Sequence, residues 1–140
     1  LDAFRRPPCL VLGNGGAARA VVYALAEQGF TGHIACRTPR GGFPWPEISY
    51  DTLTPEPTGL VVQCTSLGMH PSAELCPPLP PWSSGQVALA VDLVYNPTHT
   101  LFMQRMEELG TETLSGEAML RHQAKKAWMY WAEVLNIPHI

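Results

Sequence analysis

The chain has few lysines, no long apolar run and no cluster of basic residues. Lys125 and Lys126 are its only lysines and the net charge is -3, so we expect no basic patch that would bind nucleic acid or anionic lipid. No apolar stretch reaches the roughly 18 residues of a membrane-spanning helix. Residues 1–8 also lack the apolar core of a signal peptide. We therefore expect a cytoplasmic protein that binds neither nucleic acid nor a membrane.

The cysteines are too widely spaced for a metal or redox motif. The chain has four of them, and no two form a C-x-x-C pair, so the spacing indicates neither a zinc site nor a redox dithiol. We expect no metal site and four reduced thiols. The 14 prolines concentrate in residues 39–57 and 71–81, and these two stretches are therefore predicted to be loops.

Apolar strand-like and helix-like stretches alternate along the chain. With 140 residues, 46% of them hydrophobic, the chain is large enough for one domain with a core and too small for two full-sized ones. We expect a single α/β domain over residues 1–140, with a Rossmann-like, doubly wound, mainly parallel sheet and helices on both faces. The expected strands are 9–12, 33–36, 48–50, 60–65, 87–95 and 111–114. The expected helices are 17–28, which should be largely buried, about 98–109 and about 117–135.

A glycine-rich turn joins the first strand to the first helix. Gly13, Gly15 and Ala18 fit the G-x-G-x-x-A form of the dinucleotide-binding fingerprint. The first glycine permits a sharp turn, the second lets a pyrophosphate approach the backbone, and the alanine lets the helix lie close to its strand. Free amides at the helix N-terminus would hold the anion. A glycine turn can also be a simple connection, but its position between a strand and a helix favours nucleotide binding.

Arg37 stands where NAD-binding proteins of this class carry an acidic residue. That acidic residue follows the glycines by about 20 residues and binds the ribose 2′-hydroxyl. A guanidinium binds a 2′-phosphate instead, so Arg37, with Thr38 and Arg40 beside it, indicates NADP. The alternative is that both arginines are solvated loop charges.

Polar residues follow two of the later strands. Because ligands of parallel sheets lie beyond the carboxyl ends of the strands, Thr65 and Ser66 should face the nucleotide. Asp92, near the end of the most apolar strand, is predicted to satisfy backbone or side-chain donors there.

Several motifs in this order together resemble the C-terminal, NADP-binding domain of the shikimate dehydrogenase family. The resemblance covers nearly the whole chain and rests on residues 13–20, 37–38, 65–69, 92–97, 116–120 and 123–124. It implies oxidoreductase activity in aromatic amino acid biosynthesis, in which 3-dehydroshikimate and NADPH give shikimate and NADP. In such an enzyme the nicotinamide would offer its hydride to a carbonyl at the mouth of the cleft.

The resemblance also assigns residues to each part of the ligands. The pyrophosphate would be held by Gly13, Asn14, Gly15, Gly16 and Ala17. The 2′-phosphate would be held by Arg37 and Thr38, with a further contact from Arg40. The nicotinamide side would be lined by Thr65, Ser66, Leu93, Gly116 and Met119. The substrate would be reached by Tyr95 and Gln123.

The chain departs from the family pattern at three points. Cys36 replaces the asparagine before the Arg-Thr pair, and Arg40 stands one position before the usual second basic residue. The family's proton-transferring lysine and its partner aspartate belong to an N-terminal substrate domain and linker, and residues 1–8 contain neither. We therefore assign no catalytic residue within this chain, expect the substrate domain to be absent from it, and expect little activity from the chain alone.

The sequence is compatible with two other functions. One is a non-catalytic NADP-binding regulatory module built on the same fold, because the fold alone does not decide function. Tyr95 and Gln123 favour the enzyme, since a nucleotide sensor needs no residues aimed at a hydroxylated acid. The other is a quinate/shikimate dehydrogenase of broader specificity, because the absent domain would read the hydroxyl that distinguishes the two substrates.

Overall fold

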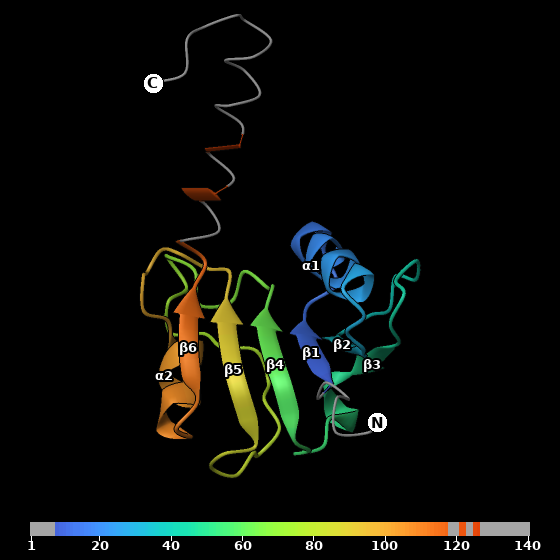
Figure 1. Ribbon diagram of the computed structural model, residues 1–140. Helices are drawn as coiled ribbons and strands as arrows, with labels where there is room; N and C mark the ends of the chain where they lie inside the picture. The colour runs from blue at the N-terminus through green and yellow to red at the C-terminus, as the bar shows by residue number, and fades with distance from the viewer. Residues whose placement is uncertain (1–7, 118–120, 123–124, 127–140) are drawn as a thin grey trace, which may run out of the picture.

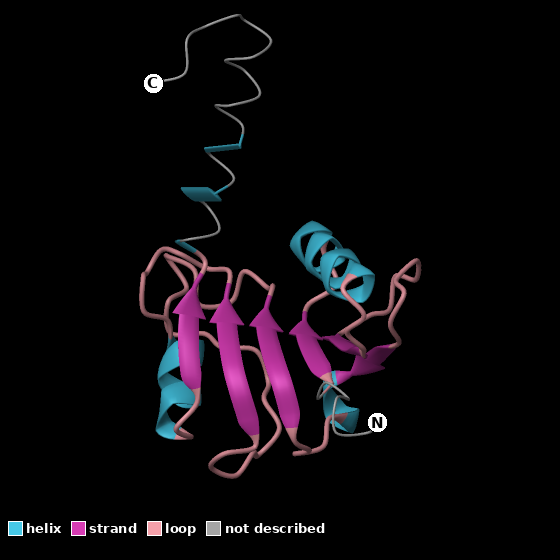
Figure 2. Cartoon of the chain, viewed as in Figure 1, coloured by secondary structure: helices cyan, strands magenta, loops and turns pink. Residues whose placement is uncertain are grey.

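A computed structural model describes residues 8–117, 121–122 and 125–126. Within these residues, six parallel strands form one sheet in the order β3-β2-β1-β4-β5-β6 (Figures 1 and 2). The strands are β1 Cys9–Leu12, β2 Gly32–Cys36, β3 Glu47–Ser49, β4 Thr58–Gln63, β5 Val87–Asp92 and β6 Glu112–Ser115. The strand order reverses at β1, where the chain returns to begin β4, as in doubly wound folds. The predicted α/β class and parallel sheet are confirmed.

The helices α1 and α2, both within the described residues, cover opposite faces of the sheet. Helix α1, Gly16–Glu27, follows β1, and helix α2, Leu101–Glu108, follows β5 (Figure 1). Val11 belongs to the apolar cluster that contains α1 residues, while its neighbour Leu12 belongs to the cluster that contains α2 residues. Because successive strand residues point to opposite faces, these two clusters lie on either side of β1, as expected for helices on both faces.

Several predicted boundaries and one burial prediction were wrong. The strand expected to reach residue 95 ends at Asp92, and α2 begins at Leu101 instead of about residue 98. The helix begins late because Thr100 is its N-cap, with Oγ1 accepting from Met103 N at 3.2 Å. Helix α1 is not largely buried: only Ala18 and Val22 are buried in it. Val21, Leu25 and Ala26 are only partly buried against the same apolar cluster, and the other apolar residues of the helix, Ala17, Ala20, Tyr23 and Ala24, are exposed. The helix expected over 117–135 falls largely outside the described residues.

The connection between β2 and β3 contains no helix. Residues 37–46, which we call the arginine loop, run directly from one strand to the next. Helix α1 holds this loop from one side: Arg19 Nη1 donates to Gly42 O at 3.0 Å and its guanidinium lies 4.5 Å from the Phe43 ring centroid. The proline-rich residues 39–46 therefore form a loop, as predicted.

Asp92 is a buried carboxylate that ties β5 to α2. Its Oδ1 accepts from Val94 N at 2.9 Å, and its Oδ2 accepts from Thr100 Oγ1 at 2.6 Å. Burial raises the pKa of Asp92, and the bonds from Thr100 and Val94 oppose that rise. The predicted role in satisfying nearby donors is confirmed.

Replacing Asp92 with alanine should lower the free energy of unfolding by about 3 kcal/mol, because two buried donors would lose their acceptor. Urea denaturation followed by circular dichroism measures this. The matched control is Asp51→Ala, an exposed residue, which should change the free energy by less than about 0.5 kcal/mol. Equal effects of the two substitutions would contradict the role given to Asp92.

All four cysteines are free, as predicted. None of the helices in the described ranges has the length and apolarity needed to cross a membrane.

Candidate nucleotide-binding site

The glycine turn leaves open space in front of α1. Gly13 has φ +98° and donates its N–H to Ala35 O at 2.8 Å. A Cβ on Gly13 would lie 2.9 Å from Thr65 Cγ2, whereas a Cβ on Gly15 or Gly16 would meet no atom within 4 Å. No side chain caps the first turn of α1. The turn is therefore tight where it crosses the sheet edge and open where a pyrophosphate would approach the helix.

A cavity of ≈ 390 Å³ begins at this turn and extends over the end of β2. Eight of the residues assigned to the cofactor from sequence line it together: Gly13, Asn14, Gly15, Arg37, Thr38, Arg40, Thr65 and Ser66. They come from the ends of β1, β2 and β4, which are adjacent in the sheet. The cavity thus joins the glycine turn to the two arginines, an arrangement suited to a ligand with two separate phosphate groups.

A second cavity of ≈ 300 Å³ adjoins the first and shares Arg37, Tyr50, Thr65 and Ser66 with it. Pro78 and Leu67 complete its lining. Burial raises the pKa of the Tyr50 phenol, which therefore stays neutral at physiological pH. Sequence reasoning missed Tyr50, although it follows β3 directly and so stands at the carboxyl edge where ligands are expected.

Five other predicted site residues within the described ranges do not line these two cavities. Gly16 and Ala17 form the exposed first turn of α1. Leu93, Tyr95 and Gly116 follow β5 and β6 at the same edge of the sheet: a Cβ on Gly116 would overlap the Leu93 carbonyl, and Tyr95 is 49% exposed. Met119 and Gln123 lie outside the described residues.

Comparison with known proteins identifies this arrangement. No family model matches the chain. The NADP(+)-dependent shikimate dehydrogenase of Thermus thermophilus is 35% identical over 136 residues, which cover 94% of this chain and 51% of the relative. The corresponding enzyme of Caldicellulosiruptor saccharolyticus is 31% identical over 140 residues, with 91% and 50% covered. The chain belongs to the shikimate dehydrogenase family. It spans about half the length of these curated relatives.

Solved structures of shikimate dehydrogenases have the same fold. The Thermus thermophilus enzyme in complex with NADP(H) and shikimate superimposes with a TM-score of 0.75 at 29% identity, over 91% of this chain and 50% of that one. A chorismate mutase/shikimate 5-dehydrogenase fusion protein from Clostridium acetobutylicum gives a TM-score of 0.75 at 32% identity, over 92% and 48%. The predicted Rossmann-like fold is confirmed, and so is the predicted resemblance to a family of NADP-dependent oxidoreductases.

Cys36, which replaces the asparagine expected from the shikimate dehydrogenase pattern, is a buried thiol that faces Glu47. Its Sγ lies 3.7 Å from Glu47 Oε2. Burial, and then the negative charge of Glu47, raise the pKa of Cys36. Cys64 also lines the larger cavity, and burial raises its pKa to about 12. Both cysteines therefore stay protonated and are poor nucleophiles.

Gln63 fixes the turn that carries Thr65, and the sequence reasoning did not assign it a role. Its side chain is fully buried. Nε2 donates to Leu67 O at 3.0 Å, while Oε1 accepts from both the amide and the hydroxyl of Thr65. A glutamine inside an otherwise apolar strand was the available signal, because a buried amide needs partners.

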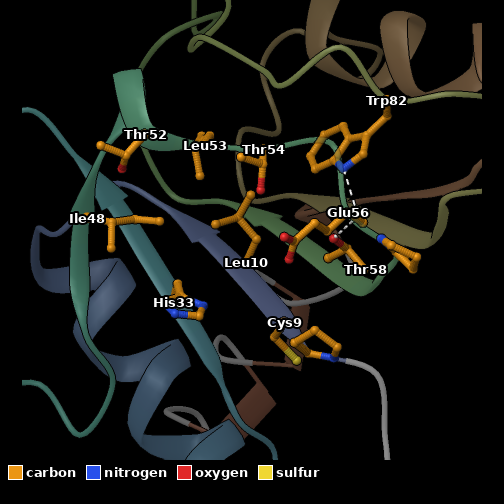
Figure 3. A pocket seen from close by; sticks show the side chains of 12 residues that line it. Cys9, Leu10, His33, Ile48, Thr52, Leu53, Thr54, Glu56, Thr58 and Trp82 are labelled. Atoms are coloured by element: carbon orange, nitrogen blue, oxygen red, sulfur yellow. Dashed lines mark hydrogen bonds between the residues drawn. The ribbon is translucent and has the colours of Figure 1, made fainter.

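A third cavity, of ≈ 280 Å³, lies at the opposite edge of the sheet (Figure 3). It is lined by the first residues of β1 and β4, Cys9 and Thr58, and by His33, Glu56 and Trp82 among others. Trp82 Nε1 donates to the Glu56 carbonyl at 3.1 Å across its rim. Since ligands of doubly wound sheets bind at the carboxyl ends of strands, this cavity is separate from the nucleotide site. No group of three or more potential metal ligands occurs within the described part of the chain.

Proposed function

We propose that this chain is the NADP-binding domain of a shikimate dehydrogenase that interconverts 3-dehydroshikimate and shikimate. The observation that carries the proposal is the single cavity lined by the glycine turn, Arg37, Thr38, Thr65 and Ser66. The open space at Gly15 fits a pyrophosphate. The guanidinium of Arg37 fits a 2′-phosphate, which it can bind through two parallel hydrogen bonds.

The adjoining cavity supports an adenine-binding role. The phenol ring of Tyr50, the Pro78 ring and the planar guanidinium of Arg37 line this cavity of ≈ 300 Å³. Flat and apolar groups of this kind accept a purine ring by stacking and cation–π contact. Adenosine would then lie beyond the second strand, with the pyrophosphate at Gly15 and the nicotinamide directed along the sheet edge towards Thr65 and Leu93.

We propose that the reaction needs groups beyond those of this chain. Bound NADPH would provide the hydride, and the described residues would hold and orient it. Tyr95 is half-exposed at the same edge, where we propose that it contacts the substrate with Gln123; Gly116 and Met119 would complete the nicotinamide side. We propose that the general acid comes from the part of the relatives' length that this chain does not span. The half-exposed Tyr95 favours the enzyme over a regulatory nucleotide-binding module.

Two measurements test the proposal. Titrating the 140-residue chain into NADPH should change the nicotinamide fluorescence with saturation, and no change at millimolar cofactor would contradict the binding role. The natural polypeptide that contains this chain should reduce NADP when given shikimate, and the 140-residue chain alone should not. Binding of NADPH without any shikimate-dependent or quinate-dependent turnover by that polypeptide would favour the regulatory module instead.

A further inference from the structure

Glu47 is a carboxylate beside the larger cavity that no family motif predicted. It is the first residue of β3 and does not line the cavity itself. Its Oε2 accepts from Asn14 Nδ2 at 2.9 Å and from Arg40 N at 2.9 Å, and its Oε1 accepts from Gly41 N at 2.6 Å. One side chain therefore takes up three N–H donors from two different segments, and the Cys36 thiol of β2 also lies 3.7 Å from its Oε2.

These two segments are the ones that would hold the cofactor's phosphates. Asn14 belongs to the glycine turn, and Arg40 and Gly41 belong to the arginine loop. Asn14 Nδ2 also donates to Thr38 O at 2.7 Å. Glu47 and Asn14 thus join the glycine turn to the arginine loop and fix how far apart the two proposed phosphate positions lie.

The arginine loop needs such a tether because it contains no helix. Gly41 and Gly42 both have positive φ, at 73° and 78°, and glycines make a loop costly to order. Arg19 and Tyr23 of α1 hold the carbonyl of Gly42. The bonds from Asn14, then Arg40 and Gly41, lower the pKa of Glu47, so its carboxylate is ionised at neutral pH and accepts these bonds at full strength.

We propose that Glu47 is a positioning residue that sets the arginine loop for the 2′-phosphate of NADP and thereby contributes to the choice of NADP over NAD. The inference rests on the proposed cofactor function and deepens it. Glu47 would favour NADPH binding through its hydrogen bonds to the loop. Its negative charge acts in the other direction, because a carboxylate repels a nearby phosphate dianion. The sign of the change on neutralising Glu47 therefore distinguishes positioning from simple electrostatics.

The test is Glu47→Gln in the 140-residue chain, with dissociation constants for NADPH and NADH from fluorescence titration. Positioning predicts NADPH binding about 10-fold weaker and NADH binding changed by less than about twofold, since only NADPH carries the phosphate that the loop would read. Tighter NADPH binding would show that the charge of Glu47 dominates and would overturn the proposal. An unchanged ratio of the two constants would also overturn it.

A local readout separates loop position from global stability. Trypsin should cleave after Arg40 faster in Glu47→Gln than in the parent, relative to cleavage after Arg105 in the same digest, and NADPH should suppress this cleavage. The matched control is Glu56→Gln, whose side chain lines the cavity at the opposite edge (Figure 3), and which should alter neither the affinities nor the cleavage ratio. An unchanged cleavage ratio in Glu47→Gln would contradict the tether.

Two further outcomes are decisive. If the parent chain binds no NADPH, the proposed cofactor function fails and the role of Glu47 fails with it. If the parent binds NADPH and Glu47→Gln behaves like the parent, only the positioning role fails.

Should Glu47→Gln not fold, Glu47→Asp takes its place. It keeps the charge but is too short to reach all three donors, so positioning again predicts weaker NADPH binding and an unchanged affinity contradicts it.

Discussion

Replacing Arg37 with aspartate should weaken NADPH binding by about 100-fold and leave NADH binding within about threefold. Losing a charge-assisted hydrogen bond to a phosphate costs about 1.5–3 kcal/mol, and a carboxylate in its place adds repulsion. Arg37 lines both cavities, so the substitution removes the proposed 2′-phosphate contact, which only NADPH makes, and one proposed adenine contact, whose loss accounts for the small effect expected on NADH. Parallel fluorescence titrations with NADPH and NADH measure the ratio of the two dissociation constants directly.

The control for this charge reversal is Arg105→Asp. Arg105 is exposed and lies in the last turn of α2, which covers the face of the sheet opposite α1. Arg105→Asp changes the net charge by the same amount as Arg37→Asp, so it reports any general effect of charge on NADPH binding. An unchanged NADPH/NADH ratio in Arg37→Asp would refute the role of Arg37, and an equal shift in Arg105→Asp would assign the effect to long-range electrostatics.

The glycine turn and the sheet were predictable because their signals are local. Four apolar residues followed by Gly13 and Gly15 specify a strand and a turn within one short window. The same holds for the absence of a helix in the arginine loop, where closely spaced prolines and glycines exclude one. Once these strands pair in parallel, their carboxyl ends meet, and Arg37 and Thr65 come to line one cavity without any further information.

The roles of Glu47 and Tyr50 were not predictable in the same way. Glu47 and Asn14 are 33 residues apart in sequence, and no spacing rule links two residues across three strands. The degree of burial of α1 was mispredicted for a related reason. An apolar composition makes a helix compatible with burial, but Tyr23 is 48% exposed because only α1's inner face contacts the sheet. Tertiary packing determines these features, and the amino-acid composition of a segment does not specify how it packs.

The glycine turn offers the sharpest separation of folding from binding. Gly13→Ala should destabilise the chain by about 2–3 kcal/mol, because its φ of +98° is strained for alanine and the new Cβ would press on Thr65 Cγ2. Gly15→Ala should leave the melting temperature within a few degrees, since its backbone is extended at φ -83° and its Cβ would meet no protein atom. Thermal unfolding followed by circular dichroism measures both.

Gly15→Ala, which should barely change stability, should have the larger effect of the two substitutions on NADPH binding. A Cβ on Gly15 would enter the space proposed for the pyrophosphate. Gly15→Ala should therefore weaken NADPH binding by about 2 kcal/mol, or about 30-fold. It should weaken NADH equally, because both cofactors carry the pyrophosphate. This parallel loss distinguishes Gly15 from Arg37 and Glu47, whose variants are expected to discriminate between the cofactors. Full NADPH affinity in a folded Gly15→Ala chain would mean that the pyrophosphate does not lie at this turn.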